Sequence, residues 1–143
     1  MNLVRFKWLL VAALFCAAIP TAATGQSRSE DWAAFTSTKE INCVLVHDNT
    51  VWTATNGGVL RLDLETQAYT RFTRLDGLAG NKIFSATADD RGHVWFGSDQ
   101  KGLSRFRPKK DAFDPPFIDF IDLKINALAV DGERLFVGMD RGI

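Results

Sequence analysis

Few residues in this chain of 143 have the types and spacing that catalysis or metal binding requires. The histidines, His47 and His93, each adjoin a predicted hairpin turn and have no second ligand at metal-site spacing. The run 89–92 (Asp-Asp-Arg-Gly) superficially looks like a calcium loop, but it lacks the alternating acids and the closing glutamate. We therefore interpret it as a hairpin turn and expect both histidines to be solvated turn residues. No metal ligand and no cofactor-binding residue is predicted.

Motifs of enzyme active sites are also missing. The sequence has no Gly-x-Ser-x-Gly nucleophile motif, no glycine loop that could cradle a phosphate, and no Cys-x-x-Cys pair. Lys109 and Lys110 are two charges in a predicted loop, which is ordinarily a solvated surface. We expect no catalytic residue in this chain, and its ligand-binding residues are unknown from sequence.

The strongest pattern is an internal repeat that begins at Ile41, Ile83 and Ile125, which are 42 residues apart. In this register the copies share a large aromatic residue, a glycine that opens the third strand, and an arginine three residues later. These positions are Trp52, Trp95 and Phe136; Gly58, Gly102 and Gly142; and Arg61 and Arg105. A period of about 40–45 residues with several short strands per unit is typical of β-propeller blades.

The predicted fold is therefore all-β, with each unit a blade, that is, a four-stranded antiparallel meander. We assign one blade to 41–73, a second to 83–120 and an incomplete third to 125–143. In the second blade a long third turn over 108–116, which includes Pro115-Pro116, is expected to leave the outer strand irregular or at an edge.

The recurrence of Trp52, Trp95 and Phe136 at one register position predicts that all three are buried between neighbouring blades. Cys43 shares its register position with Ser85 and Ala127, which are also small. We therefore expect Cys43 to fill a crowded strand position.

Residues 1–25 are typical of a secretory signal peptide. Arg5 and Lys7 precede an apolar run over 8–19, Pro20 ends the run, and small residues follow. The run is shorter than the roughly 20 residues that a membrane-spanning helix needs, so we favour cleavage over an uncleaved anchor. Cleavage would also remove Cys16 and leave Cys43 without an intrachain disulfide partner.

The charge of the chain argues against nucleic acid and anionic membranes as partners. Without Arg5 and Lys7, 15 of the 17 basic residues remain against 17 acidic ones, a net charge of about −2. The sequence has no block of lysine and arginine and no basic stripe.

The segment 31–37 resembles the outer strand of the first blade and has no blade of its own. Propellers close their ring by letting one terminus complete a blade built from the other, so we interpret 31–37 as such a clasp strand. About 2.5 blades cannot close a ring. We therefore expect the chain to be an N-terminal fragment of a longer protein, with the missing C-terminal blades as its partners.

The second copy resembles the two-component regulator propeller repeat, which typically reads D-G-L-x-x-N-x-V-x-x-I-x-x-D-x-x-G-x-x-W-x-G-T-x-x-G-L. The matching residues are Asp76, Gly77, Leu78, Asn81, Ile83, Asp89, Gly92, Trp95, Gly97, Ser98, Gly102 and Leu103. The first copy lacks the Asp-x-x-Gly turn, and the third has Met139 where threonine is usual. The WD-repeat family fits less well, because no Trp-Asp pair closes a blade.

This resemblance implies the exported, periplasmic input region of a hybrid sensor histidine kinase, whose relatives often sense oligosaccharides. An oligosaccharide or another small molecule is then the expected ligand, and dimerisation is expected only of a full-length protein. The alternative is a secreted or cell-surface propeller that acts as a binding or assembly module without a kinase. A membrane helix and kinase motifs in the same protein would favour the first hypothesis, and a sorting domain the second.

Overall fold

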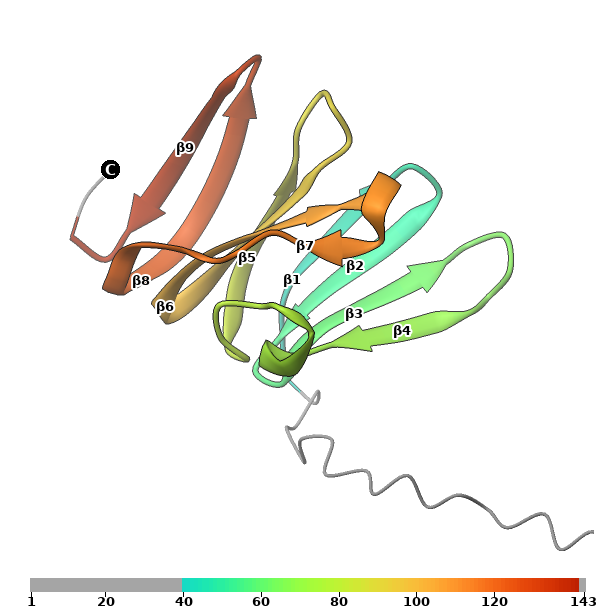
Figure 1. Ribbon diagram of the computed structural model, residues 1–143, viewed down its shortest axis with the longest axis horizontal. Helices are drawn as coiled ribbons and strands as arrows, with labels where there is room; N and C mark the ends of the chain where they lie inside the picture. The colour runs from blue at the N-terminus through green and yellow to red at the C-terminus, as the bar shows by residue number, and fades with distance from the viewer. Residues whose placement is uncertain (1–39, 142–143) are drawn as a thin grey trace, which may run out of the picture. The chain divides into compact units, whose positions relative to one another are not determined.

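A computed structural model describes residues 40–141, which hold two antiparallel sheets and two single-turn 3₁₀ helices (Figure 1). The elements are β1 (Ile41–His47), β2 (Thr50–Thr55), β3 (Gly58–Asp63), β4 (Tyr69–Phe72), η1 (Arg74–Asp76), β5 (Ile83–Ala88), β6 (Val94–Arg107), η2 (Pro108–Lys110), β7 (Ala112–Phe113), β8 (Phe117–Asp131) and β9 (Arg134–Met139). The predicted all-β fold is confirmed. The predicted signal peptide at 1–25, the clasp strand at 31–37 and residues 142–143 lie outside the described residues.

The first sheet is a meander in which β1, β2, β3 and β4 lie in chain order. Asp48 and Asn49 close the first hairpin with φ angles of 44° and 58°, the left-handed conformation that a two-residue hairpin turn favours. At the next turn Gly58 has a φ of 120°, and a Cβ there would lie 2.2 Å from the carbonyl oxygen of Phe72. Only glycine fits this position, which explains why glycine opens the third strand of the repeat.

Strand β6 folds back on itself at residues 98–102. The guanidinium of Arg105 lies 5.1 Å from the centre of the Trp95 ring, although ten residues of straight strand would span about 33 Å. Gln100 and Gly102 have left-handed φ angles of 57° and 97°, and Ser98 Oγ donates a hydrogen bond to Gly102 O. The chain therefore turns at 98–102 inside one continuous strand.

The outer strand of the second sheet begins earlier than the sequence predicts. The turn is shorter than the expected 108–116, because the tight 3₁₀ turn η2 and Asp111, with a φ of 47°, already reverse the chain. The expected irregular outer strand is confirmed, since the pairing of β8 with β6 shifts register twice. Strand β7 then pairs with the end of β6, Phe113 opposite Phe106. Pro115-Pro116 interrupt the strand only after this pairing has begun, since proline has no amide hydrogen to donate.

Strand β8 pairs with two different strands along its length. Its first half pairs with β6, with Phe117 opposite Leu103 and Lys124 opposite Asp99. Residues 125–131 pair with β9, and the bend between the halves has a φ of 66° at Asp122. The outer strand of one blade therefore continues directly into the inner strand of the next.

A repeated β-bulge shapes the first strand of each blade. The register of pairing shifts between the repeated isoleucine and the residue two positions later in all three copies. That later residue is small and pairs with another small residue: Cys43 with Ala54, Ser85 with Gly97, and Ala127 with Gly138. Cys43 is partly buried and packs against the hydrophobic core, so its predicted crowded position is confirmed.

Aromatic rings from both sheets form the core. The centre of the Trp52 ring lies 5.0 Å from that of Phe106 and 5.6 Å from that of Phe96. Phe72 lies 5.4 Å from Phe106 and 5.5 Å from Phe113. Trp52 is only 3% exposed, so its predicted burial between two blades is confirmed.

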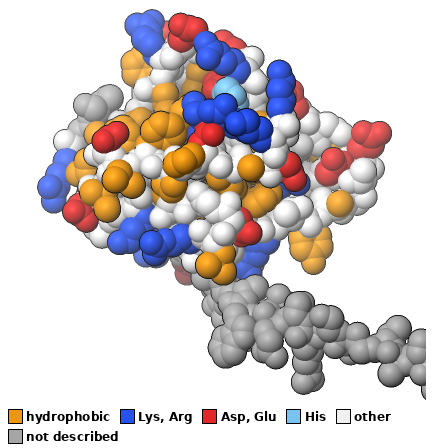
Figure 2. Space-filling model, in the orientation of Figure 1, with side chains coloured by type: hydrophobic (Ala, Val, Ile, Leu, Met, Phe, Trp, Pro, Cys, Tyr) orange, Lys and Arg blue, Asp and Glu red, His pale blue; other side chains and the backbone are white. Residues whose placement is uncertain are grey.

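Burial is not shared by the other two repeated aromatic residues. Phe136 is 44% exposed, and the prediction that it is buried is wrong, because no described element covers that face of β9. Trp95 is half-buried. Hydrophobic side chains reach the surface elsewhere as well, and Figure 2 shows them interspersed with charges of both signs.

The link between the blades is shaped by the residues that carry the family resemblance. Asp76 Oδ2 accepts hydrogen bonds from the amide and the hydroxyl of Thr73, which fixes η1. Gly77 follows with a φ of 108°, and Leu78 is 1% exposed within the core. Asn81 Oδ1 then accepts a backbone N–H from the start of η1. Each of these motif residues therefore has a structural role in the link.

Candidate functional site

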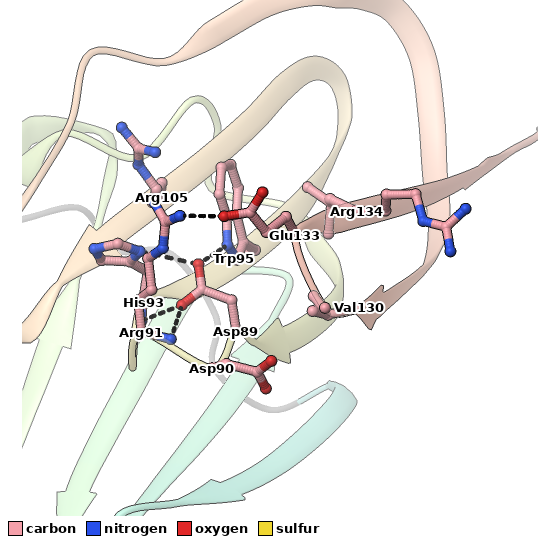
Figure 3. A pocket seen from close by; sticks show the side chains of 11 residues that line it. Asp89, Asp90, Arg91, His93, Trp95, Arg105, Val130, Glu133 and Arg134 are labelled. Carbon is pink, nitrogen blue, oxygen red and sulfur yellow. Dashed lines mark hydrogen bonds and ion pairs between the residues drawn. The ribbon is translucent and has the colours of Figure 1, made fainter.

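A pocket of about 610 Å³ lies between the β5–β6 turn and the β8–β9 turn (Figure 3). Residues of the two turns form its rim, and Trp95 and Arg105 of β6 lie on its floor. The lining residues are Asp89, Asp90, Arg91, His93, Trp95, Arg105, Val130, Gly132, Glu133, Arg134 and Leu135. Three carboxylates face three guanidinium groups, so neither sign of charge is in excess.

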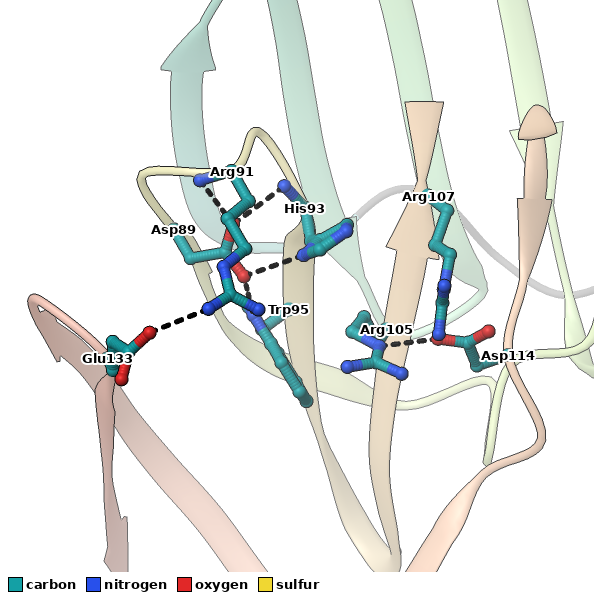
Figure 4. A network of polar contacts seen from close by, with 8 residues as sticks. All are labelled: Asp89, Arg91, His93, Trp95, Arg105, Arg107, Asp114 and Glu133. Atoms are coloured by element: carbon teal, nitrogen blue, oxygen red, sulfur yellow. Dashed lines mark hydrogen bonds and ion pairs between the residues drawn. The ribbon is translucent and has the colours of Figure 1, made fainter. Parts of the chain in front are cut away.

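Asp89 organises the turn on one side of this pocket (Figure 4). Its Oδ1 accepts the backbone N–H groups of Arg91 and His93. Its Oδ2 accepts the indole N–H of Trp95 at 3.0 Å and lies 2.9 Å from Nδ1 of His93. Ala88 pairs with Val94 across the turn, so the predicted hairpin is confirmed. The carboxylate of Asp89 accepts hydrogen bonds from N–H groups of this hairpin.

The electrostatics of Asp89 follow from these contacts. Burial by itself raises the pKa of the carboxyl group, but the hydrogen bonds from Trp95 and His93 outweigh burial and hold the pKa below its usual value. The carboxylate is therefore ionised at neutral pH and holds the tryptophan and the histidine in place.

Neither histidine is the solvated turn residue that the sequence predicts. The side chain of His93 is 21% exposed and bonds Asp89. The side chain of His47 is 28% exposed, with its Nε2 3.1 Å from Oδ2 of Asp48. The prediction is wrong for both because each tight turn brings an aspartate within contact of its histidine.

One ion pair crosses from one side of the rim to the other. Arg91, in the β5–β6 turn, lies 2.7 Å from the carboxylate of Glu133, in the β8–β9 turn. The two side chains are 71% and 88% exposed, so solvent screens this pair and its contribution to stability is small. A ligand that displaces this ion pair would therefore lose little binding free energy.

The side chains on the floor of the pocket are held by several contacts with one another. The guanidinium of Arg105 lies 5.1 Å from the Trp95 ring centre and 5.5 Å from that of Phe117. Asp114 bonds Nε of Arg105 and lies 2.7 Å from Nε of Arg107. Burial alone would raise the pKa of Asp114, but the hydrogen bonds from Arg107 and Arg105 lower it.

This arrangement is suited to reversible binding of a polar molecule. Asp90, Arg91, Glu133 and Arg134, which we call the turn rim, are all exposed and present both hydrogen-bond donors and acceptors. Val130 and Leu135 add apolar surface beside them. The repeat places the two turns at equivalent positions of consecutive blades, but the turns differ in residue type, so the sequence alone did not indicate a shared rim.

Two further features are absent from residues 40–141. This part of the chain contains no cluster of three or more histidine, cysteine or acidic side chains that could hold a metal ion. It also contains no helix long and apolar enough to cross a membrane.

Comparison with known families adds a finding to this geometry. The family model described as the two component regulator propeller matches residues 77–100. These residues are a two-component regulator propeller repeat. The match spans the link with Gly77, all of β5, and the hairpin organised by Asp89, and it confirms the family resemblance. No curated protein matches the sequence.

Solved structures support the same fold. The extracellular domain of BT4673 from B. thetaiotaomicron, assigned as a one component system in one structure and as a hybrid two component system in another, matches with TM-scores of 0.60 in both cases. Identities are 22% and 23%, over 70% and 71% of this chain. The extracellular domain of the hybrid two component system BT3049 from the same organism matches with a TM-score of 0.57 and 17% identity over 68% of this chain. The chain spans 14% of each of those chains, and identities this low establish the fold alone.

Proposed function

We propose that this chain is part of the exported, ligand-sensing region of a two-component signalling protein, the periplasmic input region of a hybrid sensor histidine kinase. The observation that carries the proposal is the propeller repeat at 77–100, on a fold shared with extracellular domains of proteins assigned to hybrid two component systems. The typical signal-peptide pattern of residues 1–25 supports export. The chain's own role in this proposal is binding, not catalysis.

The turn rim is the proposed ligand site. Its carboxylates and guanidinium groups lie within one opening and can bond hydroxyl groups as acceptors and donors, respectively. The balance of charge disfavours a strongly anionic or cationic ligand. We therefore propose an uncharged molecule with several hydroxyl groups, such as an oligosaccharide, as the ligand class.

Export is tested by fusing residues 1–143 to alkaline phosphatase that lacks its own signal sequence, since this enzyme is active only outside the cytoplasm. We expect activity with the intact chain and its loss when residues 1–25 are deleted. Activity that is equal with and without residues 1–25, or absent from both, would contradict the proposal.

Ligand binding is tested by nuclear magnetic resonance of the full chain, titrated with a panel of neutral oligosaccharides. The amides of Gly92 and Gly132 lie in the two turns and report on the rim. We expect at least one oligosaccharide to shift both, and Arg134→Ala to weaken that binding about tenfold, the effect of losing one or two hydrogen bonds. Lys109→Ala, in the exposed η2 turn outside the pocket, is the matched control and should bind normally. Binding that Arg134→Ala leaves unchanged would exclude the rim.

A second candidate function is a secreted or cell-surface module for assembly. The observation that favours it is exposed apolar surface, with Val44, Val46 and Phe136 being 56%, 65% and 44% exposed. Sedimentation of the purified chain separates the two candidates: a defined oligomer that forms without added ligand would favour assembly.

A further inference from the structure

A carboxylate outside the pocket bonds the arginine on the pocket floor. Asp114 directly follows β7 and lies outside the set of residues that line the pocket. Its Oδ2 accepts a hydrogen bond from Nε of Arg105 and lies 2.7 Å from Nε of Arg107 (Figure 4). The backbone N–H of Asp114 also donates to the carbonyl oxygen of Arg105 at 2.9 Å. Asp114 and Arg105 are therefore joined through both main chain and side chain.

The position of Asp114 is fixed by the residues on either side of it. The ring of Phe113 packs in the core, 5.1 Å from that of Phe106 and 5.5 Å from that of Phe72. Pro115 restricts the backbone of the residue before it to extended conformations. Successive side chains of an extended chain point to opposite faces, so Asp114 points away from this core. Its side chain is only 15% exposed, which leaves the carboxylate few alternative positions.

Contacts continue from Arg105 to the turn rim. The guanidinium of Arg105 lies 5.1 Å from the centre of the Trp95 ring. The indole N–H of Trp95 donates to Oδ2 of Asp89 at 3.0 Å, and Oδ1 of Asp89 accepts the backbone N–H of Arg91, a residue of the turn rim. An unbroken series of contacts therefore joins Asp114 to the rim.

A second acid beside β7 serves the equivalent arginine of the first blade. Asp111, directly before β7, forms an ion pair with Arg61, which lies 5.8 Å from the centre of the Trp52 ring. The residue that pairs with Arg61 across the strands is Thr70, which has no carboxylate to offer. The two acids that flank β7 thus bond two different arginines, and only Asp114 bonds the arginine of the pocket.

We propose that Asp114 is a positioning residue for the turn rim, and that it acts through Arg105 and Trp95 to hold the turn that carries Arg91. A cation–π contact places a guanidinium over a ring but does not fix its rotation, whereas a charge-assisted hydrogen bond to a carboxylate does. Without Asp114, the guanidinium of Arg105 would turn on the Trp95 ring, and the indole would lose a fixed support. The ligand-binding role of the rim rests on the function proposed above, but the series of contacts does not.

Hydrogen exchange in the full chain, followed by nuclear magnetic resonance under native conditions, tests this role. We expect Asp114→Asn to speed exchange of the Trp95 indole N–H about fivefold or more, because the ring loses the support of Arg105. The backbone N–H of Arg91, which bonds Asp89, should also exchange faster in this variant.

Asp111→Asn is the matched control, since it removes the other carboxylate that flanks β7. This variant takes the ion pair from Arg61 and leaves Asp114 in place, so the Trp95 indole should exchange at its normal rate. The Trp52 indole should in turn be unaffected by Asp114→Asn. The two variants together separate a specific contact from a general loss of stability.

A second comparison tests whether Asp114 acts through Arg105. Arg105→Lys keeps the positive charge but lacks Nε and the planar fork, so it should speed exchange of the Trp95 indole as Asp114→Asn does. Residues that act as a unit have non-additive effects, so the double variant should exchange no faster than the faster single variant. If Asp114→Asn does not fold, Asp114→Glu, which displaces the carboxylate by one methylene, takes its place in each comparison.

Three results would overturn the proposal. The first is exchange of the Trp95 indole or of the Arg91 amide that Asp114→Asn leaves unchanged. The second is faster exchange of both the Trp95 and the Trp52 indoles in either variant, because the effect would then be a general loss of stability. The third is a double variant whose acceleration equals the product of the two single ones, because Asp114 and Arg105 would then act independently.

Ligand binding gives a separate measurement. For an oligosaccharide that shifts the amides of Gly92 and Gly132, Asp114→Asn should weaken binding about threefold or more, as for the loss of a residue that supports a site. Asp111→Asn should leave this binding unchanged, and equal binding by both variants would contradict a role for Asp114 at the rim. If no oligosaccharide binds, the proposed function fails, whereas the exchange of Trp95 and Arg91 still decides whether Asp114 positions the rim.

Discussion

Ile125 lies directly over Gly97. A Cβ at Gly97 would come within 2.3 Å of Cγ2 of Ile125 and 2.4 Å of Oγ of Ser85. The repeated isoleucine of one blade thus rests on the small residues of the blade before it. This contact accounts for the isoleucine at position 125 and for the small residues that pair beneath it.

The first prediction concerns this contact. We expect Gly97→Ala to destabilise the fold by about 1–3 kcal/mol, the usual cost of overpacking a filled site. Chemical denaturation followed by circular dichroism measures the change. Gly138→Ala is the matched control from the third copy, where the nearest atom would be the Ala127 Cβ at 3.3 Å, and it should cost less. If both variants are equally stable, the contact with Ile125 does not decide the residue at Gly97.

The second prediction concerns the pH dependence of stability. The pKa of Asp89 is lower in the folded chain than its unfolded value of about 3.9. Its contribution is therefore complete above pH about 4 and is lost as the pH falls through the folded pKa. We expect Asp89→Asn to be less stable than the unaltered chain at pH 7, and the difference to shrink in acid.

Denaturation at several pH values between neutral and acid tests this prediction. Asp90→Asn is the matched control, since Asp90 is the exposed neighbour in the same turn. It should have little effect at either pH. A stability difference for Asp89→Asn that stays constant down to low pH would show that its charge is not responsible.

The third prediction separates two kinds of contact made by Arg61, which lies over aromatic rings of the core and forms an ion pair with Asp111. Arg61→Met removes the cation over three aromatic rings and also the ion pair with Asp111. We expect a loss of about 1–2 kcal/mol. Asp111→Asn removes only the ion pair, and since Asp111 is 68% exposed, we expect a loss below about 1 kcal/mol. Equal losses for the two variants in thermal unfolding would mean that stacking on the rings adds nothing.

The fourth prediction compares repeated aromatic residues that differ in burial. Trp52→Ala should cost about 3–5 kcal/mol, because a buried ring leaves a cavity. Phe136→Ala should cost less than about 1 kcal/mol, because 44% of Phe136 is already exposed. Urea denaturation of both variants provides the measurement. A large loss for Phe136→Ala would indicate that this face is covered in solution.

The blades could be predicted from the sequence because each repeated residue has a local or nearest-neighbour cause. Gly58 and Gly102 are fixed by a positive φ and a close carbonyl, and Ile125 by the small residues Ser85 and Gly97 beneath it. Such causes recur with the repeat and leave a period in the sequence.

The site could not be predicted in the same way. The turn rim joins Arg91 and Glu133, which are 42 positions apart and so hold the same register position in consecutive repeats. The repeat indicates that their turns belong to neighbouring blades, but the two turns differ in residue type, and the sequence does not show that these side chains meet. The sequence showed that Arg61 and Arg105 hold the same register position. It did not show that each arginine lies over aromatic rings, because those rings come from neighbouring strands. The burial of Phe136 failed as a prediction because burial depends on what packs against a residue and not on its place in the repeat.

The continuity of β8 has a mechanical consequence. One unbroken strand of 15 residues is hydrogen-bonded first to β6 and then to β9. Tension applied to the third blade is therefore carried as shear along the backbone hydrogen bonds of the second blade, with no flexible linker to absorb it. Such a chain resists pulling from one blade to the next as a unit, and a displacement of β9 is transmitted to the strand that holds Trp95 and Arg105.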